Sequence, residues 1–165
     1  MKAPAFAYVK PASLLEAFEL LQNPNAKILA GGQSLIPSLN MRLSSPELLV
    51  DITGLPGLSE IKVLNGFVRI GALVTHARME KSPDIKKHIP LLAQAVPHVA
   101  HAAIRNRGTI GGSLALADPA AEYPACAVAL EAVVILKSKT TERRVKAAEF
   151  FNGLFETDLK PGELL

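Results

Sequence analysis

The chain contains no tryptophan, a single cysteine and only 5% aromatic residues, and these shortages exclude several kinds of structure. Because Cys126 stands alone, the chain cannot form an internal disulfide, hold an iron–sulfur cluster or complete a cysteine-based zinc site by itself. We therefore expect a protein of a reducing compartment. Since 49% of the 165 residues are hydrophobic, the chain can still bury a core, made mainly of Leu, Ile, Val and Ala.

Long apolar runs are also missing. No stretch approaches the roughly 20 residues that cross a bilayer, and the opening residues MKAPAFAYVKP lack the sustained apolar segment of a signal peptide. We expect a soluble, cytoplasmic protein without a transmembrane segment. The net charge of +3 is too small to indicate nucleic-acid binding. The densest basic run, KSKTTERRVK at 137–146, fits either a solvated hairpin or a docking surface for a partner.

The first 54 residues predict a small α/β unit. Phe6 to Val9 alternate like a short strand, and Ser13 with Glu16 forms a capping box that begins a helix ending near Gln22. The apolar runs AKILA at 26–30 and ELLVDIT at 47–53 predict two buried strands. The cluster of Gly and Pro at 54–57 then marks a break, so we predict two subdomains, residues 1–54 and 55–165.

The second subdomain predicts helices between antiparallel hairpins. Asn65-Gly66 separates two apolar runs and is a strong hairpin signal, and VVILKSK with TERRVKA predicts a second hairpin. We expect helices from about 90 to 101 and from about 122 to 130, with a polar, glycine-rich segment between them.

Two glycine pairs are the strongest hints of a ligand. Gly31-Gly32 is followed by Gln33-Ser34, and Gly111-Gly112 is followed by Ser113. Successive backbone N–H groups in such turns can converge on an anion, so two such segments suggest one extended ligand with a diphosphate. Each pair alone is also typical of a plain turn. Neither matches the nucleotide-binding patterns G-x-x-x-x-G-K-[ST] or G-x-G-x-x-G.

Four motifs together carry a family resemblance: AGGQSLIP at 30–37, IRNRGTIGGS at 104–113, ADPAAEYPA at 117–125 and PGELL at 161–165. In their order and spacing the chain resembles the FAD-binding medium subunit of the xanthine oxidase family of molybdenum hydroxylases, most closely that of aerobic carbon monoxide dehydrogenases. The resemblance implies an α+β fold of the vanillyl-alcohol-oxidase (PCMH) type. In that fold FAD lies between a small α/β lobe and a larger, mainly antiparallel α+β lobe.

The resemblance also implies the cofactor site. The first glycine segment would wrap the FAD diphosphate and ribityl chain, and the second would close on them from the other lobe. Ile104 would pack near the flavin or adenine, and Asp118 would hydrogen-bond a cofactor hydroxyl. The implied cofactor-binding residues are Ala30, Gly31, Gly32, Gln33, Ser34, Leu35, Ile104, Gly108, Thr109, Ile110, Gly111, Gly112, Ser113, Ala117 and Asp118.

Several polar residues remain open to two interpretations. Arg105 and Arg107 are either charge partners of the diphosphate or members of salt bridges. Asp118 is either a cofactor ligand or a cap for the helix that begins near Glu122.

The remaining reactive side chains do not suggest a metal or redox centre. His76, His88, His98 and His101 lack metal-ligand spacing, so we expect no metal site. Cys126 lies in an alanine-rich helix, where a small buried residue is favoured over a redox group.

By resemblance, the chain is a flavoprotein oxidoreductase subunit that does not hydroxylate the substrate and has no catalytic residue of its own. A large molybdopterin-binding subunit and a small iron–sulfur subunit would be its partners, and electrons from the clusters would pass through FAD to an external acceptor. Family members continue past PGELL, so we expect this chain to lack their C-terminal domain. Two alternatives are a truncated, cofactor-free assembly module and a stand-alone flavin reductase of the same superfamily.

Overall fold

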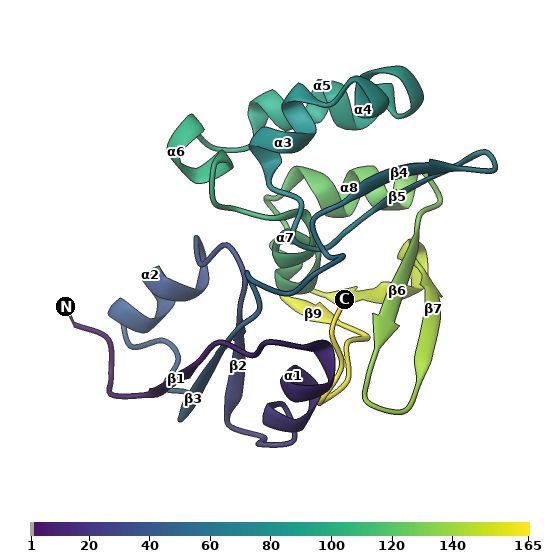
Figure 1. The fold of residues 1–165 in the computed structure, drawn as a ribbon. Helices are drawn as coiled ribbons and strands as arrows, with labels where there is room; N and C mark the ends of the chain where they lie inside the picture. The colour runs from purple at the N-terminus through teal and green to yellow at the C-terminus, as the bar shows by residue number, and fades with distance from the viewer. Residues whose placement is uncertain (1) are drawn as a thin grey trace.

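The N-terminal lobe is a three-stranded parallel sheet with its helices packed around it (Figure 1). A computed structural model describes residues 2–165 of the chain. The strand order is β1-β3-β2, so β3 is central, and its residues Leu49 and Val50 are almost completely buried. The elements are β1 (Ala7–Val9), α1 (Leu14–Leu20), β2 (Ala26–Leu29), α2 (Leu35–Asn40) and β3 (Leu48–Asp51).

The capping box predicted at Ser13 begins α1, with one difference. The Ser13 hydroxyl accepts a hydrogen bond from the Glu16 backbone N–H at 3.2 Å, as predicted. The Glu16 carboxylate, however, accepts from the Ala12 N–H at 2.7 Å. Both bonds satisfy backbone donors around the helix start that the helix itself cannot pair.

The second lobe combines antiparallel hairpins with short helices, as the fold-class prediction expected, and it lies above and to the right of the first in Figure 1. Asn65 and Gly66 both have positive φ and join β4 to β5 in the predicted hairpin. The elements are β4 (Ile61–Leu64), β5 (Phe67–Ile70), α3 (His76–Lys81), α4 (Pro83–His88), α5 (Pro90–Ala95), η1 (Val96–His98), α6 (Ala102–Arg105), α7 (Ile110–Leu116), α8 (Glu122–Ala129), β6 (Val133–Lys137), β7 (Glu142–Lys146), α9 (Ala147–Phe150), β8 (Phe151–Gly153) and β9 (Glu156–Thr157).

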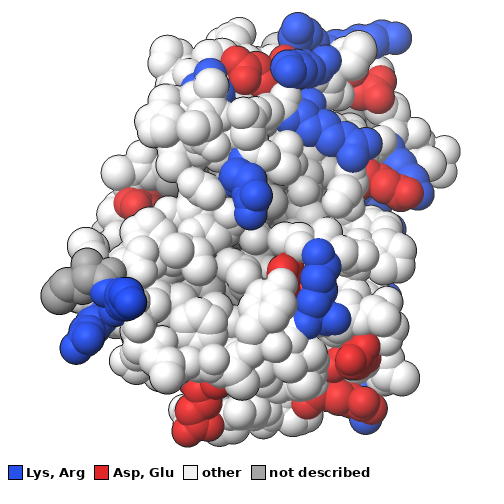
Figure 2. Space-filling model, turned by 60° about the vertical axis from the view of Figure 1, so that its left-hand side comes forward, with Lys and Arg blue, Asp and Glu red and all other residues white. Residues whose placement is uncertain are grey.

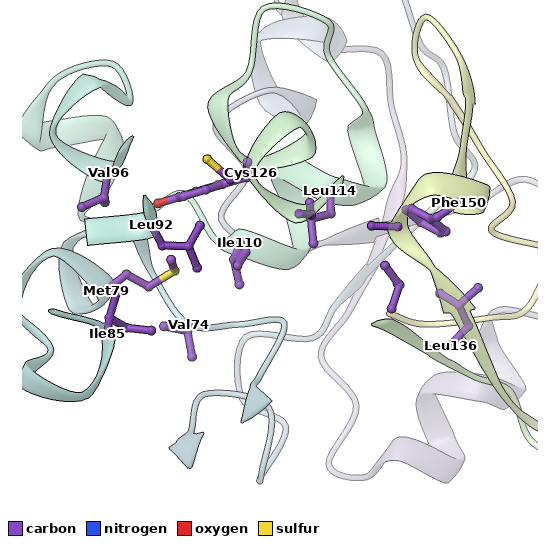
Figure 3. Packing of buried hydrophobic residues seen from close by; sticks show 14 residues of the cluster. Val74, Met79, Ile85, Leu92, Val96, Ile110, Leu114, Cys126, Leu136 and Phe150 are labelled. Atoms are coloured by element: carbon purple, nitrogen blue, oxygen red, sulfur yellow. The ribbon is translucent and has the colours of Figure 1, made fainter. Parts of the chain in front are cut away.

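One continuous core runs through the second lobe (Figure 3). Apolar side chains of α3 to η1 meet those of α7 and α8, and the cluster continues to β6 and α9. Most members are aliphatic, and Tyr123 and Phe150 are the buried aromatic residues within it. Cys126 is a buried free thiol in this core. Burial and, to a smaller extent, the charge of Glu122 raise its pKa, so the thiol stays neutral.

The smaller core belongs to the first lobe but uses residues from the second. Ala17 and Phe18 of α1 pack with Val50, and Leu73 and Leu164 from beyond the predicted boundary join them. An ion pair between Lys139 and Glu19, at 3.0 Å, also joins the lobes. The division at residues 54 and 55 therefore stays a prediction, because the two parts share packing.

The C-terminal segment is held against the β6–β7 hairpin, which forms from the basic run as predicted. The Arg143 guanidinium donates to both carboxylate oxygens of Glu163 at 2.8 Å and to Asp158 at 2.6 Å. Hydrogen bonds to Glu163, and then to Asp158, raise the pKa of Arg143 above its already high value. Arg143 in turn lowers the pKa of both carboxyl groups. Arg143 is therefore a structural cation.

Two predicted local structures differ from those observed, and helix α2 was not predicted. The helix predicted for 90–101 ends at Ala95, because Pro97 has no N–H to continue the ladder and a 3₁₀ turn follows. The glycine-rich segment after 101 contains α6 and α7. Pro37 lies in the first turn of α2, where its missing N–H costs nothing. Among residues 2–165, no helix has the length and apolar character needed to span a membrane.

Candidate functional site

The turn after β2 brings the two lobes into backbone contact at Gly31. A Cβ atom on Gly31 would lie 2.8 Å from Gly108 Cα and would overlap the Arg107 carbonyl. The next residue, Gly32, has a φ of +73°, which strains any L side chain. The first pair therefore needs glycine for two reasons, a close approach of backbones at Gly31 and a left-handed conformation at Gly32.

The backbone of this turn also offers unused hydrogen-bond donors. Within residues 2–165, the N–H groups of residues 31–35 donate to no protein acceptor. The Gln33 side-chain amide instead donates back to the Gly31 carbonyl at 3.1 Å, which stabilises the turn. Consecutive free N–H groups in a turn are suited to an anion such as a phosphate.

Residues 31–33 of this run line a cleft of about 380 Å³ between β2, β3, α2 and the Arg107 turn. Figure 2 shows isolated cationic side chains on the face turned forward, without one continuous basic patch. An anion in the cleft would therefore meet backbone amides and single cations. The lining residues are Leu29, Ala30, Gly31, Gly32, Gln33, Ile36, Pro37, Asp51, Thr53 and Arg107.

The two arginines of the IRNRG motif have different environments. Arg105 donates to Glu80 at 3.1 Å and to the carbonyls of Val99 and Ala100 at 3.2 Å, so it ties α6 to α3 and to the turn before α6. Arg107 is exposed, lines the cleft and forms no ion pair among the described residues. The structure thus favours the salt-bridge interpretation for Arg105 and leaves Arg107 available to a ligand.

Asp51 is a fixed carboxylate in the cleft wall, although it is only 7% exposed. Its Oδ1 accepts from the Thr53 N–H at 2.8 Å and the Thr53 hydroxyl at 2.6 Å, and Oδ2 accepts from the Tyr8 hydroxyl. Burial alone raises the pKa of Asp51, but these hydrogen bonds and Lys10 outweigh it and hold the pKa below its usual value. The carboxylate is ionised and can accept a hydrogen bond from a ligand hydroxyl.

The second glycine pair has a different structure, and our prediction of a free amide cradle there is wrong. Gly111 begins α7 inside the core, where its N–H donates to the Ala72 carbonyl at 2.9 Å. The Gly112 N–H donates to the Thr109 hydroxyl at 3.2 Å, and the Ser113 N–H to the Thr109 carbonyl at 3.1 Å. Thr109, Ile110 and Gly111 are buried, whereas Gly112 is exposed.

The other predicted cofactor residues surround this helix. Ala117 ends α7 with a φ of +51°, and its carbonyl accepts from the Phe155 N–H at 3.1 Å. Asp118 Oδ1 accepts from the Ala120 N–H at 2.9 Å in a turn before α8, whose N-cap is Ala121. Asp118 is thus not the helix cap, and its role toward a cofactor stays a prediction. Ile104 is half-buried in α6.

Residue-level reasoning missed part of the cleft. Asp51 and Thr53 follow a buried strand and could have been found from that position, because ligands collect at the carboxyl ends of parallel strands. Ile36 and Pro37 line the cleft from α2, which the sequence did not predict as a helix.

Comparison with known proteins agrees with the geometry. Residues 4–165 match the family described as "FAD binding domain in molybdopterin dehydrogenase". The chain is 43% identical over 166 residues to the nicotine 6-hydroxylase medium subunit of Paenarthrobacter nicotinovorans, covering 100% of this chain and 59% of the relative. It is 39% identical over 167 residues to the carbon monoxide dehydrogenase medium chain of Hydrogenophaga pseudoflava, covering 100% and 58%.

Solved structures are similarly close. The quinoline 2-oxidoreductase of Pseudomonas putida 86 matches with a TM-score of 0.97 and 46% identity, covering 99% of this chain and 58% of that chain. Carbon monoxide dehydrogenase of Hydrogenophaga pseudoflava matches with a TM-score of 0.98 and 40% identity, covering 100% and 58%. The chain thus spans a little more than half the length of the relatives that it matches.

Proposed function

Because the chain belongs to the family of FAD-binding domains in molybdopterin dehydrogenases, we propose that it is the flavin-carrying part of a molybdenum hydroxylase medium subunit. FAD is the cofactor of this family. The α+β fold predicted from the sequence is the fold of the family's solved members. The residues of the cleft provide a test of whether this particular chain fits the cofactor.

The cleft fits the diphosphate of FAD. Unpaired N–H groups at residues 31–35 supply neutral donors, and Arg107 supplies a cation at the cleft wall. A diphosphate needs both kinds of partner, and preformed amide donors require little rearrangement on binding. This run of free donors, which begins in the cleft wall at a glycine that admits no Cβ, is the observation that carries the proposal.

The remaining predicted residues would complete the site around α7. Thr109 and Ser113 bring hydroxyls to the start and first turn of the helix, and exposed Gly112 lets a ligand approach the backbone. Asp51 would accept a cofactor hydroxyl from the opposite wall, where Thr53 and Tyr8 hold it in place. These residues bind and orient; none of them is required to transfer a proton.

The chemistry supplied by bound FAD is electron transfer between a one-electron donor and an external acceptor. The protein positions the flavin for this exchange and is not the catalyst of substrate hydroxylation. Medium subunits are named as parts of nicotine 6-hydroxylase and carbon monoxide dehydrogenase. By analogy, a molybdopterin-binding large subunit and an iron–sulfur small subunit are the partners of this chain, and the clusters donate its electrons.

An absorbance spectrum tests the cofactor assignment directly. We would mix the purified chain with FAD, remove the excess by gel filtration and record the spectrum from about 300 to 550 nm, where oxidised flavins absorb in two bands. Retained bands that bleach with dithionite would support the proposal. A colourless protein that remains folded by circular dichroism would contradict FAD binding by this chain.

The electron-transfer role needs a separate test with partner subunits. We would reconstitute the chain with the large and small subunits and follow flavin reduction after adding the substrate of the large subunit. The proposal predicts reduction only when the iron–sulfur subunit is present. Equal reduction without that subunit would contradict the proposed electron route.

A further inference from the structure

Two buried polar atoms of the second lobe have no hydrogen-bond partner among residues 2–165. Tyr123 is 1% exposed and His76 is 5% exposed, and neither the Tyr123 hydroxyl nor His76 Nδ1 has a hydrogen-bond partner. Leaving a buried polar group unpaired costs about 1–3 kcal/mol, and such groups are rare in folded proteins. Because the two side chains are in contact, a single small partner could serve both atoms.

The two side chains contact each other, and the His76 side chain also contacts the turn at Gly108. Their ring centroids are 5.1 Å apart, with the ring planes inclined at 47°. The His76 backbone N–H donates to the Gly108 carbonyl at 3.0 Å, and a Cβ on Gly108 would lie only 2.6 Å from Nε2 of the His76 side chain. The imidazole therefore packs closely against the backbone at Gly108, and Gly31 also approaches that backbone closely.

The chemistry of the pair suits one water molecule. Burial first, and then the Arg105 cation, lower the pKa of His76 to about 4, so the imidazole is neutral at pH 7. Burial likewise raises the pKa of Tyr123, which keeps its hydroxyl protonated. A neutral imidazole nitrogen and a phenol can each be completed by water, and proteins of this size contain several such internal waters.

We propose that one internal water molecule bridges His76 Nδ1 and the Tyr123 hydroxyl, and that this bridge positions the Gly108 turn against Gly31. The hydration site links α3 and α8 within the core of the second lobe. Its importance for closing the FAD cleft rests on the proposed function, whereas the water bridge itself does not. His76 and Tyr123 are thus positioning residues that act through Gly108.

The change in Tm caused by Tyr123→Phe tests the water bridge, and this measurement needs no cofactor. If the water is present, Tyr123→Phe removes one of its partners, and we expect the Tm of the chain to fall by about 3 °C. If no water contacts the Tyr123 hydroxyl and it is unpaired, the same substitution removes the cost of burying that hydroxyl. The Tm then stays unchanged or rises. That second result would overturn the bridge.

A double-mutant cycle with His76→Leu adds a check that the two residues act together. The bridge predicts that Tyr123→Phe lowers the Tm of the wild-type chain but has little further effect in the His76→Leu background. Additive effects would contradict a shared water, even if each substitution alone is destabilising.

Hydrogen exchange and FAD affinity test the positioning role. In Tyr123→Phe, amides of residues 104–110 should exchange faster, and the Kd for FAD should rise about fivefold. Phe150→Leu is the matched control, because it disturbs the same core away from Gly108 and should lower the Tm without either effect. Unchanged exchange at 104–110 in Tyr123→Phe would overturn the positioning role. A wild-type chain that binds no FAD would instead contradict the proposed function, and the exchange result would still decide the inference.

Discussion

Gly31-Gly32 and Gly111-Gly112 share a sequence pattern, but their backbone N–H groups have different partners. Around the first pair, the amides of residues 31–35 donate to no acceptor among the described residues, and residues 31–33 line a cleft. Around the second, Gly111 donates to Ala72 and Gly112 to Thr109 inside a helix that packs into the core. The comparison teaches that one pair keeps donors open for a ligand, whereas the other lets a helix pack closely against the preceding chain.

The largest effect on stability should come from replacing Gly111, the glycine that packs into the core. In Gly111→Ala, the new Cβ would lie 2.8 Å from Ala72 Cα and 2.7 Å from its carbonyl oxygen, both backbone atoms that cannot easily move. We expect the free energy of unfolding to fall by about 3 kcal/mol, measured by urea denaturation. Gly112→Ala is the control, because it is exposed in the same helix and its Cβ would meet only the Thr109 side-chain hydroxyl, at 3.0 Å, so it should lower stability by much less than Gly111→Ala. Equal effects of the two substitutions would contradict the packing role.

Filling the first glycine of the other pair should affect ligand binding as well as packing. Gly31→Ala places a Cβ against the Arg107 and Gly108 backbone, so the lobes must separate and the cleft must change shape. We expect the affinity for FAD to fall about 100-fold, or about 2.7 kcal/mol, measured by flavin fluorescence titration.

Gly153→Ala is the control for this change, because its Cβ would make only ordinary contacts with Glu156 in a hairpin away from the cleft. Its FAD affinity should equal that of the wild type. If Gly31→Ala also binds FAD normally, the contact between the two turns has no role in the site.

Arg105 and Arg107 allow a similar comparison, between a side chain bonded within the protein and one that is exposed at the cleft. Arg105→Gln removes a partly buried cation from Glu80 and from backbone carbonyls, so we expect a loss of about 2 kcal/mol in unfolding free energy. The FAD affinity of the folded protein should change less than about threefold. A large loss of affinity with unchanged stability would reverse our assignment of the two arginines.

Arg107→Gln should give the smallest effect, a loss of affinity for FAD without a change in stability. Its guanidinium lines the cleft without a salt bridge to another described residue, so its removal should not alter folding. We expect the Kd for FAD to rise about tenfold, with a weaker dependence on salt than in the wild type. An unchanged salt dependence would show that Arg107 does not face the diphosphate.

Local signals in the sequence predicted the local structure well. Ser13 caps its helix and Asn65-Gly66 turns its hairpin, because both depend on neighbouring residues only. The glycine pair at 31–32 was also correctly predicted to follow a strand. The family resemblance implied that this segment and Gly108 both contact the cofactor, but the direct contact between Gly31 and Gly108 was not predicted.

The structure of the second glycine pair could not be predicted in this way. Its helix forms with Thr109 as a cap, but Gly111 is buried because the chain around Ala72 and Val74 accepts N–H groups at the helix start. Those acceptors are distant in sequence and become neighbours only through tertiary packing. Asp51 differs, because its position at the end of a buried strand was a signal that could have been used, although the walls that complete its cleft, α2 and the Arg107 turn, were not predictable from it.

The affinity for FAD compared with riboflavin tests the central claim most directly, because riboflavin has the same ring system and ribityl chain but no phosphate. We would titrate both into the chain by calorimetry at equal ionic strength. If the free amides of residues 31–35 and Arg107 hold the diphosphate, FAD should bind at least about 100-fold more tightly. Equal affinities would contradict the claim that the first glycine segment is the diphosphate site.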